Sequence, residues 1–287
     1  MGEARAEYSA IIDRKPLKLP GGARVAVWVA VNVEDWDINE KMARTLLPYP
    51  QGVTVIPDVV NYGWFDYGLR VGIWRIMDVL ERAGIRGTTS LNASICDHYP
   101  RVVDACLDKG WEMLAHGYVQ RPLFLEDDGR AEIRRTIDRI AEYAGKPPRG
   151  WMGPGLGESW DTPDILAEEG IEYLCDWCND DQPYRMPVRS GSMVSIPYTL
   201  ELNDIPVHLV KNQPSGALFD LAKETFDTLY REGADSARIM CVSVHPYITG
   251  VAHRIRFFEQ IFDYIRGHDQ VVFMTAEEIL DWYNSVA

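Results

Sequence analysis

The stretch RVAVWVAVNV, which covers Arg24–Val33, is a continuous apolar run rich in valine. Such a run is typical of a parallel strand that is covered on both faces. Strand-like segments of this kind alternate with amphipathic helical segments about eight times along the chain, with no internal repeat and no low-complexity linker. This alternation predicts βαβ units and a mostly parallel sheet.

The predicted sheet could close into a barrel or remain an open, doubly wound sheet. A barrel would gather functional residues at the carboxyl ends of its strands. No glycine-rich phosphate loop follows the first strand, which disfavours the nucleotide-binding form of the open sheet. We expect one domain over residues 1–287, with an N-terminal extension at 1–23 and a long loop at 37–63.

Composition excludes several classes of partner. The net charge is -14, whereas nucleic acids and anionic membranes require a basic face. No apolar stretch is long enough to cross a bilayer, and the first ten residues lack a signal-peptide core, so we expect a cytoplasmic protein. The long loop and nine tryptophans favour subunit contacts and predict a homo-oligomer, a dimer or a tetramer.

Polar side chains follow three of the predicted strands at the point where each strand ends. Glu34 and Asp35 follow the first strand, His116 ends the strand WEMLA, and His245 ends the strand RIMCVSV. In a barrel these groups would converge at one edge of the sheet. Neighbouring carboxylates can perform acid–base chemistry, or one can bind a metal while the other accepts a proton.

Other polar motifs are weaker candidates. The pair Cys175 and Cys178 has the spacing of a redox or zinc motif, but no second pair completes a zinc site and no helix is expected after it. Asp181 and Tyr184 lie in a segment that could be a solvated turn or a substrate-facing loop. In IPYTLELND, which ends at Asp204, a turn is favoured. The histidines that we expect on the surface are His98, His208, His253 and His268.

The motifs NVEDW, LAHGYVQ, GWMGPG, DDQPY and SVH, in this order, resemble the polysaccharide deacetylase (NodB-homology) superfamily. The segments FDYGLRVGIWRI, IPYTLELND and FDTLYREG are more similar to its branch of metal-independent allantoinases and cyclic imide hydrolases. The resemblance covers roughly Tyr8 to Tyr283. It implies a deformed (β/α) barrel of about seven parallel strands.

The resemblance also implies roles for individual residues. In the sugar deacetylases the first motif supplies a base carboxylate and a metal-binding aspartate, at the positions of Glu34 and Asp35. The second motif supplies two metal-binding histidines, where this chain has His116 and Gln120. An arginine that steadies the base corresponds to Met152. A neutral amide is a poor zinc ligand, so we expect no metal and no cofactor, with a weak Mn or Zn site as the alternative.

The residues at the strand ends and the resemblance together predict a metal-independent hydrolase of a non-peptide C–N bond in a cyclic amide, ureide or imide. Glu34 or Asp35 would accept a proton from water, and His245 would protonate the leaving nitrogen. His116 would orient the substrate or stabilise an oxyanion. The residues that we expect to contact the small-molecule substrate are Gln120, Trp151, Asp181, Tyr184 and Arg254.

Two other functions remain open from sequence. One is a metal-dependent N-deacetylase of an acetylated sugar or peptidoglycan, which the glutamine at position 120 disfavours. The other is a non-catalytic ligand-binding protein on the same barrel, which the retained carboxylates and His245 disfavour.

Overall fold

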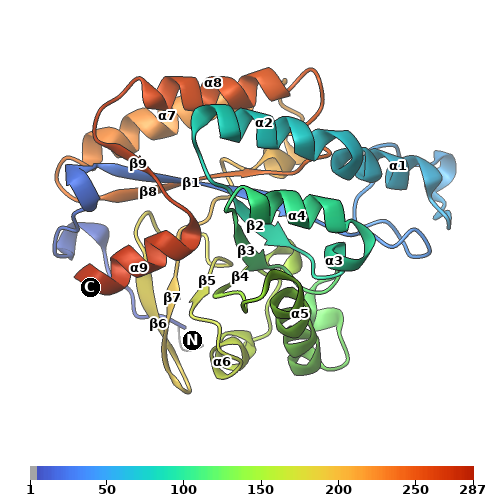
Figure 1. Cartoon of the computed structure of the whole chain (residues 1–287), viewed down its shortest axis with the longest axis horizontal. Coiled ribbons are helices and arrows are strands. Elements are labelled where there is room, and N and C mark those ends of the chain that lie inside the picture. Colours follow the sequence, from blue (N-terminus) through green and yellow to red (C-terminus); the bar gives the residue numbers. More distant parts are fainter. Residues whose placement is uncertain (1–4) are drawn as a thin grey trace.

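The computed structural model describes residues 5–287, so the start of the predicted N-terminal extension lies outside it. One nine-stranded sheet curls into a half-barrel, and helices cover its outer face (Figure 1). The strands are β1 Val25–Val33, β2 Thr88–Leu91, β3 Glu112–Ala115, β4 Gly150–Trp151, β5 Tyr173–Leu174, β6 Tyr184–Val188, β7 Gly191–Ser195, β8 Arg238–Val244 and β9 Val271–Phe273. The helices are α1 Val59–Tyr67, α2 Ile73–Ala83, α3 Ile95–His98, α4 Pro100–Asp108, α5 Gly129–Ala144, α6 Thr162–Glu168, α7 Ala217–Glu232, α8 Ile255–Arg266 and α9 Ala276–Val286.

The strands follow the order β6-β7-β5-β4-β3-β2-β1-β8, with β9 also paired to β1. Every pairing is parallel except the hairpin of β6 and β7. The predicted deformed (β/α) barrel is therefore confirmed. The hairpin was not foreseen, because β6 follows a polar turn and contains Pro187, a residue that sheets accept mainly in edge strands.

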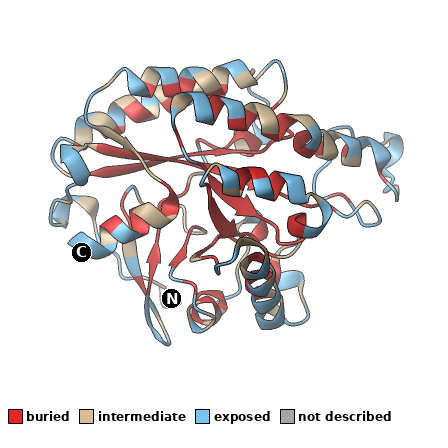
Figure 2. Ribbon diagram, in the orientation of Figure 1, coloured by how far each residue is buried: buried red, intermediate tan, exposed pale blue. Residues whose placement is uncertain are grey.

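Strand β1 runs through the middle of the core, and all nine of its residues are buried (Figure 2). Its side chains alternate between two apolar clusters. Val27 and Val29 belong to the larger cluster beneath the helices, whereas Ala26, Trp28 and Ala30 belong to a smaller cluster inside the barrel. The valine-rich run is thus explained by a strand that is covered on both faces.

Strand pairing does not close the barrel on the far side of β8. Coil segments line that edge instead: Ile239 donates its backbone N–H to the carbonyl of Asp181 at 2.9 Å, and Ser243 donates to Leu202 at 2.9 Å. These two contacts lie toward opposite ends of β8, which spans Arg238–Val244. They decide which neighbouring residues can reach the carboxyl end of the barrel.

The long loop after β1 is shorter than predicted. It ends at Asp58, whose side chain accepts a hydrogen bond from the backbone N–H of Asn61 and caps α1. Residues 59–63 are helical, although the exposed Val59 and Val60 obscure any amphipathic spacing in the sequence. Asn61 also accepts the backbone N–H groups of Leu46 and Leu47, which ties the loop to the helix.

The segment that follows β8 packs tightly against the start of α2. A Cβ added to Gly72 would lie 2.0 Å from the carbonyl oxygen of Pro246, so only glycine fits there. This close approach fixes Tyr247, which follows Pro246, beside the carboxyl end of β1.

Among residues 5–287, none of the helices has the length and apolar character needed to span a membrane.

Candidate active site

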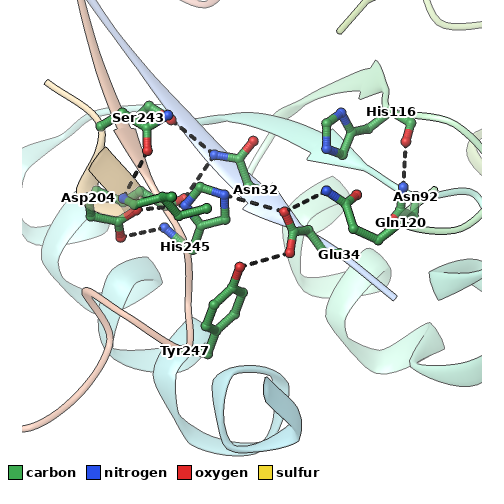
Figure 3. Close-up of polar contacts among 12 residues, drawn as sticks. Asn32, Glu34, Asn92, His116, Gln120, Asp204, Ser243, His245 and Tyr247 are labelled. Atoms are coloured by element: carbon green, nitrogen blue, oxygen red, sulfur yellow. Dashed lines mark hydrogen bonds and ion pairs between the residues drawn. The ribbon is translucent and has the colours of Figure 1, made fainter. Parts of the chain in front are cut away.

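Four of the predicted site residues meet at the carboxyl ends of β1, β3 and β8 (Figure 3). Glu34 directly continues the interior face of β1, His116 follows β3, and His245 follows β8. Their exposed fractions are only 3%, 3% and 4%. Gln120 reaches the same place from the loop after β3, because its backbone N–H donates to the carbonyl of Asp35 at 3.1 Å. The polar groups therefore converge as a barrel requires.

The carboxylate of Glu34 is surrounded by donors. Its Oε1 accepts from Nε2 of Gln120 at 2.9 Å and lies 3.4 Å from Nε2 of His245. Its Oε2 accepts from the indole N–H of Trp36 and the hydroxyl of Tyr247, both at 2.9 Å. A carboxylate with two donors on each oxygen has used nearly all its acceptor capacity. These four donors stabilise the ionised form of Glu34.

His245 is held between two carboxylates. Its Nδ1 lies 2.6 Å from Oδ1 of Asp204, and its backbone N–H donates to Oδ2 of the same residue at 2.7 Å. Thr249 also donates its hydroxyl to that Oδ2, at 2.7 Å. Asp204 thereby fixes the ring so that Nε2 points at Glu34.

These contacts set the charges of the pair. Burial on its own would raise the pKa of Glu34, but attraction to His245 and the hydrogen bonds outweigh it and lower that pKa to about 2. Burial would lower the pKa of His245, but Asp204 and then Glu34 outweigh it and raise that pKa to about 9. At neutral pH Glu34 is therefore ionised and His245 carries a proton on both nitrogens.

Asp35 takes no part in this pair. Its side chain points to the opposite face of the chain, where Oδ2 lies 2.6 Å from Nδ1 of His98. Successive residues of an extended chain face opposite sides, so Glu34 and Asp35 do not act together on one substrate. Glu34 is paired with His245 instead. His98 is exposed, as predicted, but it still serves to hold Asp35.

His116 is oriented by the backbone of the next strand. Its Nδ1 donates to the carbonyl of Met152, which leaves the lone pair of a neutral ring on Nε2. Burial lowers the pKa of His116, so the ring is neutral at pH 7. Nε2 can then accept a hydrogen bond but cannot donate one. The predicted oxyanion role does not fit this state, whereas orienting water or substrate does.

The ligand set implied by the sugar deacetylases does not fit a divalent metal here. Asp35 is engaged by His98, and Gln120 turns its amide nitrogen toward Glu34. Within residues 5–287, no group of three or more His, Cys, Asp or Glu side chains is arranged to hold a metal ion. The atom that Gln120 could offer a metal is its neutral amide oxygen, which is a poor ligand for zinc. We therefore derive no step through a metal.

Three predicted substrate contacts lie elsewhere. Trp151 is fully buried in the apolar cluster beneath the helices, because it occupies the outward-facing position of β4 while Met152 faces the barrel interior. The carbonyl of Asp181 pairs with Ile239 at the amino end of β8, opposite to His245. Asp181 and Tyr184 both line a separate groove of about 1600 Å³ beside N-terminal residues 5–17.

Arg254 is close enough to Asp204 to feel its charge, and no hydrogen bond joins it to Glu34 among the described residues. Its guanidinium donates to the carbonyl of Ile248 at 3.2 Å. Burial lowers the pKa of Arg254, and the charge of Asp204 partly offsets this effect. His208 was expected on the surface but is only 6% exposed, with its Nδ1 directed at the carbonyl of Gln213. A polar residue in a helical turn gives no sequence signal for such burial.

The cysteines show no sign of redox chemistry. All five are free, and burial raises the pKa of Cys175 and Cys178 above the usual value, to about 12 for the latter. A reactive cysteine requires a lowered pKa.

Sequence reasoning missed Asp204, Tyr247 and Trp36. Asp204 was interpreted as part of a turn, although a carboxylate that follows a strand-like segment is the same signal that identified Glu34. Tyr247 and Trp36 stand two residues after His245 and Glu34, respectively. An aromatic residue at this spacing offers a second donor to the same site, and that spacing could have identified both.

The chain is similar to known proteins in sequence and in fold. Residues 58–174 match the sequence model of the polysaccharide deacetylase family. The chain is similar to this family over that segment. It is 23% identical to the peptidoglycan deacetylase of Helicobacter pylori, over 78% of this chain and 87% of that protein. It is also 23% identical to peptidoglycan deacetylase-like protein FGM2 of Gibberella zeae, over 96% and 91% of the two chains.

Among solved structures, PuuE allantoinase superimposes with a TM-score of 0.87 and 25% identity, covering 98% of both chains. Deacetylases and allantoinases are hydrolases of C–N bonds other than peptide bonds, and this protein is a hydrolase of the same class. The cytoplasmic location and the homo-oligomeric state stay predictions.

The raised pKa of His245 predicts a specific dependence of stability on pH. The pKa rises from 6.5 to about 9 on folding, so the stabilisation is complete below pH 6.5 and is lost as the pH rises toward 9. We expect the difference in free energy of unfolding between the wild type and His245→Gln to shrink over this interval. Urea denaturation of both proteins at several pH values measures it. A difference that grows with pH would contradict the charged state of His245.

Proposed function

We propose that this protein opens a cyclic amide, ureide or imide by hydrolysis of its C–N bond, without a catalytic metal. The observation that carries the proposal is the buried pair of ionised Glu34 and protonated His245, with the amide of Gln120 in the place of a metal ligand. An ionised carboxylate can accept a proton and an imidazolium can donate one, and hydrolysis of a C–N bond requires both.

The reaction follows from these charge states. The water oxygen attacks the ring carbonyl carbon and forms the new C–O bond. The water gives up one proton to Glu34. The C–N bond then breaks, and His245 donates its Nε2 proton to the leaving nitrogen. Both new ends remain in a single ring-opened product. The proton on Glu34 returns to Nε2 of His245 across their 3.4 Å contact, which restores the starting state.

Glu34 must release one donor before it can accept a proton. Its contact with His245 is the longest of the four, at 3.4 Å against 2.9 Å for the other three. When His245 turns its proton toward the substrate nitrogen, Oε1 of Glu34 loses that donor and becomes more basic. The movement of this proton therefore activates both the acid, His245, and the base, Glu34. His116, which can only accept through Nε2, is suited to orient the attacking water.

N-deacetylation of a sugar or peptidoglycan is the second candidate, supported by the names of the relatives that this chain resembles. The contact of Asp35 with His98 and the contact of Gln120 with Glu34 leave these residues poorly arranged for a metal, which favours the ring hydrolase. A deacetylase of this family type would draw its electrophilic assistance from a metal. Here donors from Gln120, Trp36 and Tyr247 occupy the carboxylate instead.

A substrate panel with and without a strong chelator tests the proposal. The panel contains allantoin, hydantoin, succinimide, dihydrouracil and N-acetylglucosamine oligomers. We expect ring opening of at least one cyclic compound at a rate that chelator does not change. Release of acetate that chelator abolishes would overturn the proposal in favour of the deacetylase.

Paired substitutions at Glu34 and Asp35 identify the base. We expect Glu34→Gln to lower kcat by at least about 1000-fold, because a general base contributes roughly this much. Asp35→Asn should lower kcat by less than about tenfold, since the Asp35 side chain faces His98 and not the site. Circular dichroism and thermal unfolding confirm that both variants fold. Equal losses in the two variants would refute the assignment of Glu34 as the base.

A further inference from the structure

The side chain of Gln120 has unused hydrogen-bonding groups in the centre of the site. One amide N–H donates to Oε1 of Glu34 at 2.9 Å. The amide oxygen, Oε1, is shielded from water and has no hydrogen-bond partner. Figure 3 shows Gln120 reaching toward Glu34 on the side of the site where His116 lies. A buried acceptor without a donor is costly, so each such group in a folded protein calls for an explanation, for example a catalytic role.

The orientation of this amide is fixed by chemistry. Nε2 of Gln120 lies 2.9 Å from Oε1 of Glu34, whose other oxygen accepts from Trp36 and Tyr247, as expected of an ionised carboxylate with acceptor oxygens only. The nitrogen of Gln120 must therefore face Glu34, and its oxygen must face the other way. An amide nitrogen carries two hydrogens, of which Glu34 takes one. When Glu34 takes the N–H that points away from the amide oxygen, the second N–H and the oxygen lie side by side as a donor–acceptor pair.

Such a pair matches only one arrangement of a substrate amide. An amide whose N–H and C=O lie on the same side, the cis form, can bond both groups to one glutamine amide. Ring amides, imides and ureides have this form because the ring enforces it. An open-chain N-acetyl amide is trans, and its cis form costs about 2.5–4 kcal/mol. It can satisfy the donor or the acceptor of Gln120, but not both at once.

We propose that Gln120 is the specificity-determining residue of this site, and that it selects substrates whose scissile bond is a cis amide bearing an N–H. This inference rests on the proposed ring hydrolysis and names what the site recognises in the ring. The second amide N–H of Gln120 bonds to the oxygen of the attacked carbonyl. It thereby supplies the oxyanion donor that neutral His116 does not.

The acceptor of Gln120 bonds to the N–H of the ring. During cleavage the ring nitrogen keeps this hydrogen, gains a second from His245, and leaves as an NH₂ group. The carbonyl carbon gains the hydroxyl of water and becomes a carboxyl group. Gln120 thus holds the amide by both ends while the bond between carbon and nitrogen breaks.

Methylation of the ring nitrogen tests this directly. Succinimide and N-methylsuccinimide differ only at the hydrogen that Gln120 would accept. We expect wild-type kcat/KM to favour succinimide by about 100-fold, since the methyl compound leaves the buried acceptor unpaired. In Gln120→Ala the acceptor is absent and space is open, so the ratio should fall to within about threefold. Hydantoin with and without a methyl group on its imide nitrogen gives a second pair.

Tyr247→Phe is the matched control. It removes a different hydrogen bond to Glu34 and leaves the oxygen of Gln120 in place. We expect it to lower kcat/KM for both compounds and to keep their ratio near the wild-type value. Loss of activity through Glu34 is thereby separated from loss of recognition through Gln120.

The outcomes distinguish this inference from the proposed function. Wild-type protein that hydrolyses both compounds equally well, or Gln120→Ala that keeps the wild-type ratio, would overturn the role of Gln120 and leave ring hydrolysis intact. The wild-type ratio needs no variant, so a failure of Gln120→Ala to fold does not remove the test. Wild-type protein that hydrolyses no ring compound in the panel would overturn both.

Discussion

The buried ion pair between Glu34 and His245 is the interaction on which this site depends. A buried charge is costly unless it is paired and hydrogen-bonded. Here Glu34 accepts three hydrogen bonds besides its contact with His245, and Asp204 holds the other ring nitrogen. The fold therefore holds a charged proton donor and a charged proton acceptor side by side, away from water, at neutral pH.

The sheet creates this pair through its register. Strands β1 and β8 are parallel neighbours with Val31 opposite Val244, so the residues that follow them emerge at the same edge. The two-residue period of β1 then sends Glu34 into the barrel and Asp35 out of it. The close packing of Gly72 against Pro246 places Tyr247 on the remaining side of Glu34. The chemistry thus follows from strand geometry rather than from a mobile loop.

The sequence could predict the features that depend on the spacing of apolar residues and on the order of strands and helices along the chain. The valine-rich run at Arg24–Val33 predicted a strand buried on both faces, and strand alternation predicted the parallel sheet and the meeting of Glu34, His116 and His245. The errors concern the direction of single side chains. Trp151 faces the helices, and Asp181 reaches the amino end of β8, which no local pattern reveals. Asp204 was missed because its partner, His245, is distant in sequence.

The replacement of a histidine by Gln120 acquires a physical meaning in this structure. The amide donates to Glu34, and it retains a second N–H and an oxygen without a partner. The same residue would then support the base and recognise the ring.

The most direct test of the central claim is the protonation state of His245, measured by ¹⁵N NMR of its imidazole across a pH titration. The charged pair predicts that both ring nitrogens stay protonated until the pH approaches about 9, and that Glu34→Gln lowers this midpoint. A wild-type midpoint at or below 6.5, unchanged in Glu34→Gln, would contradict the account.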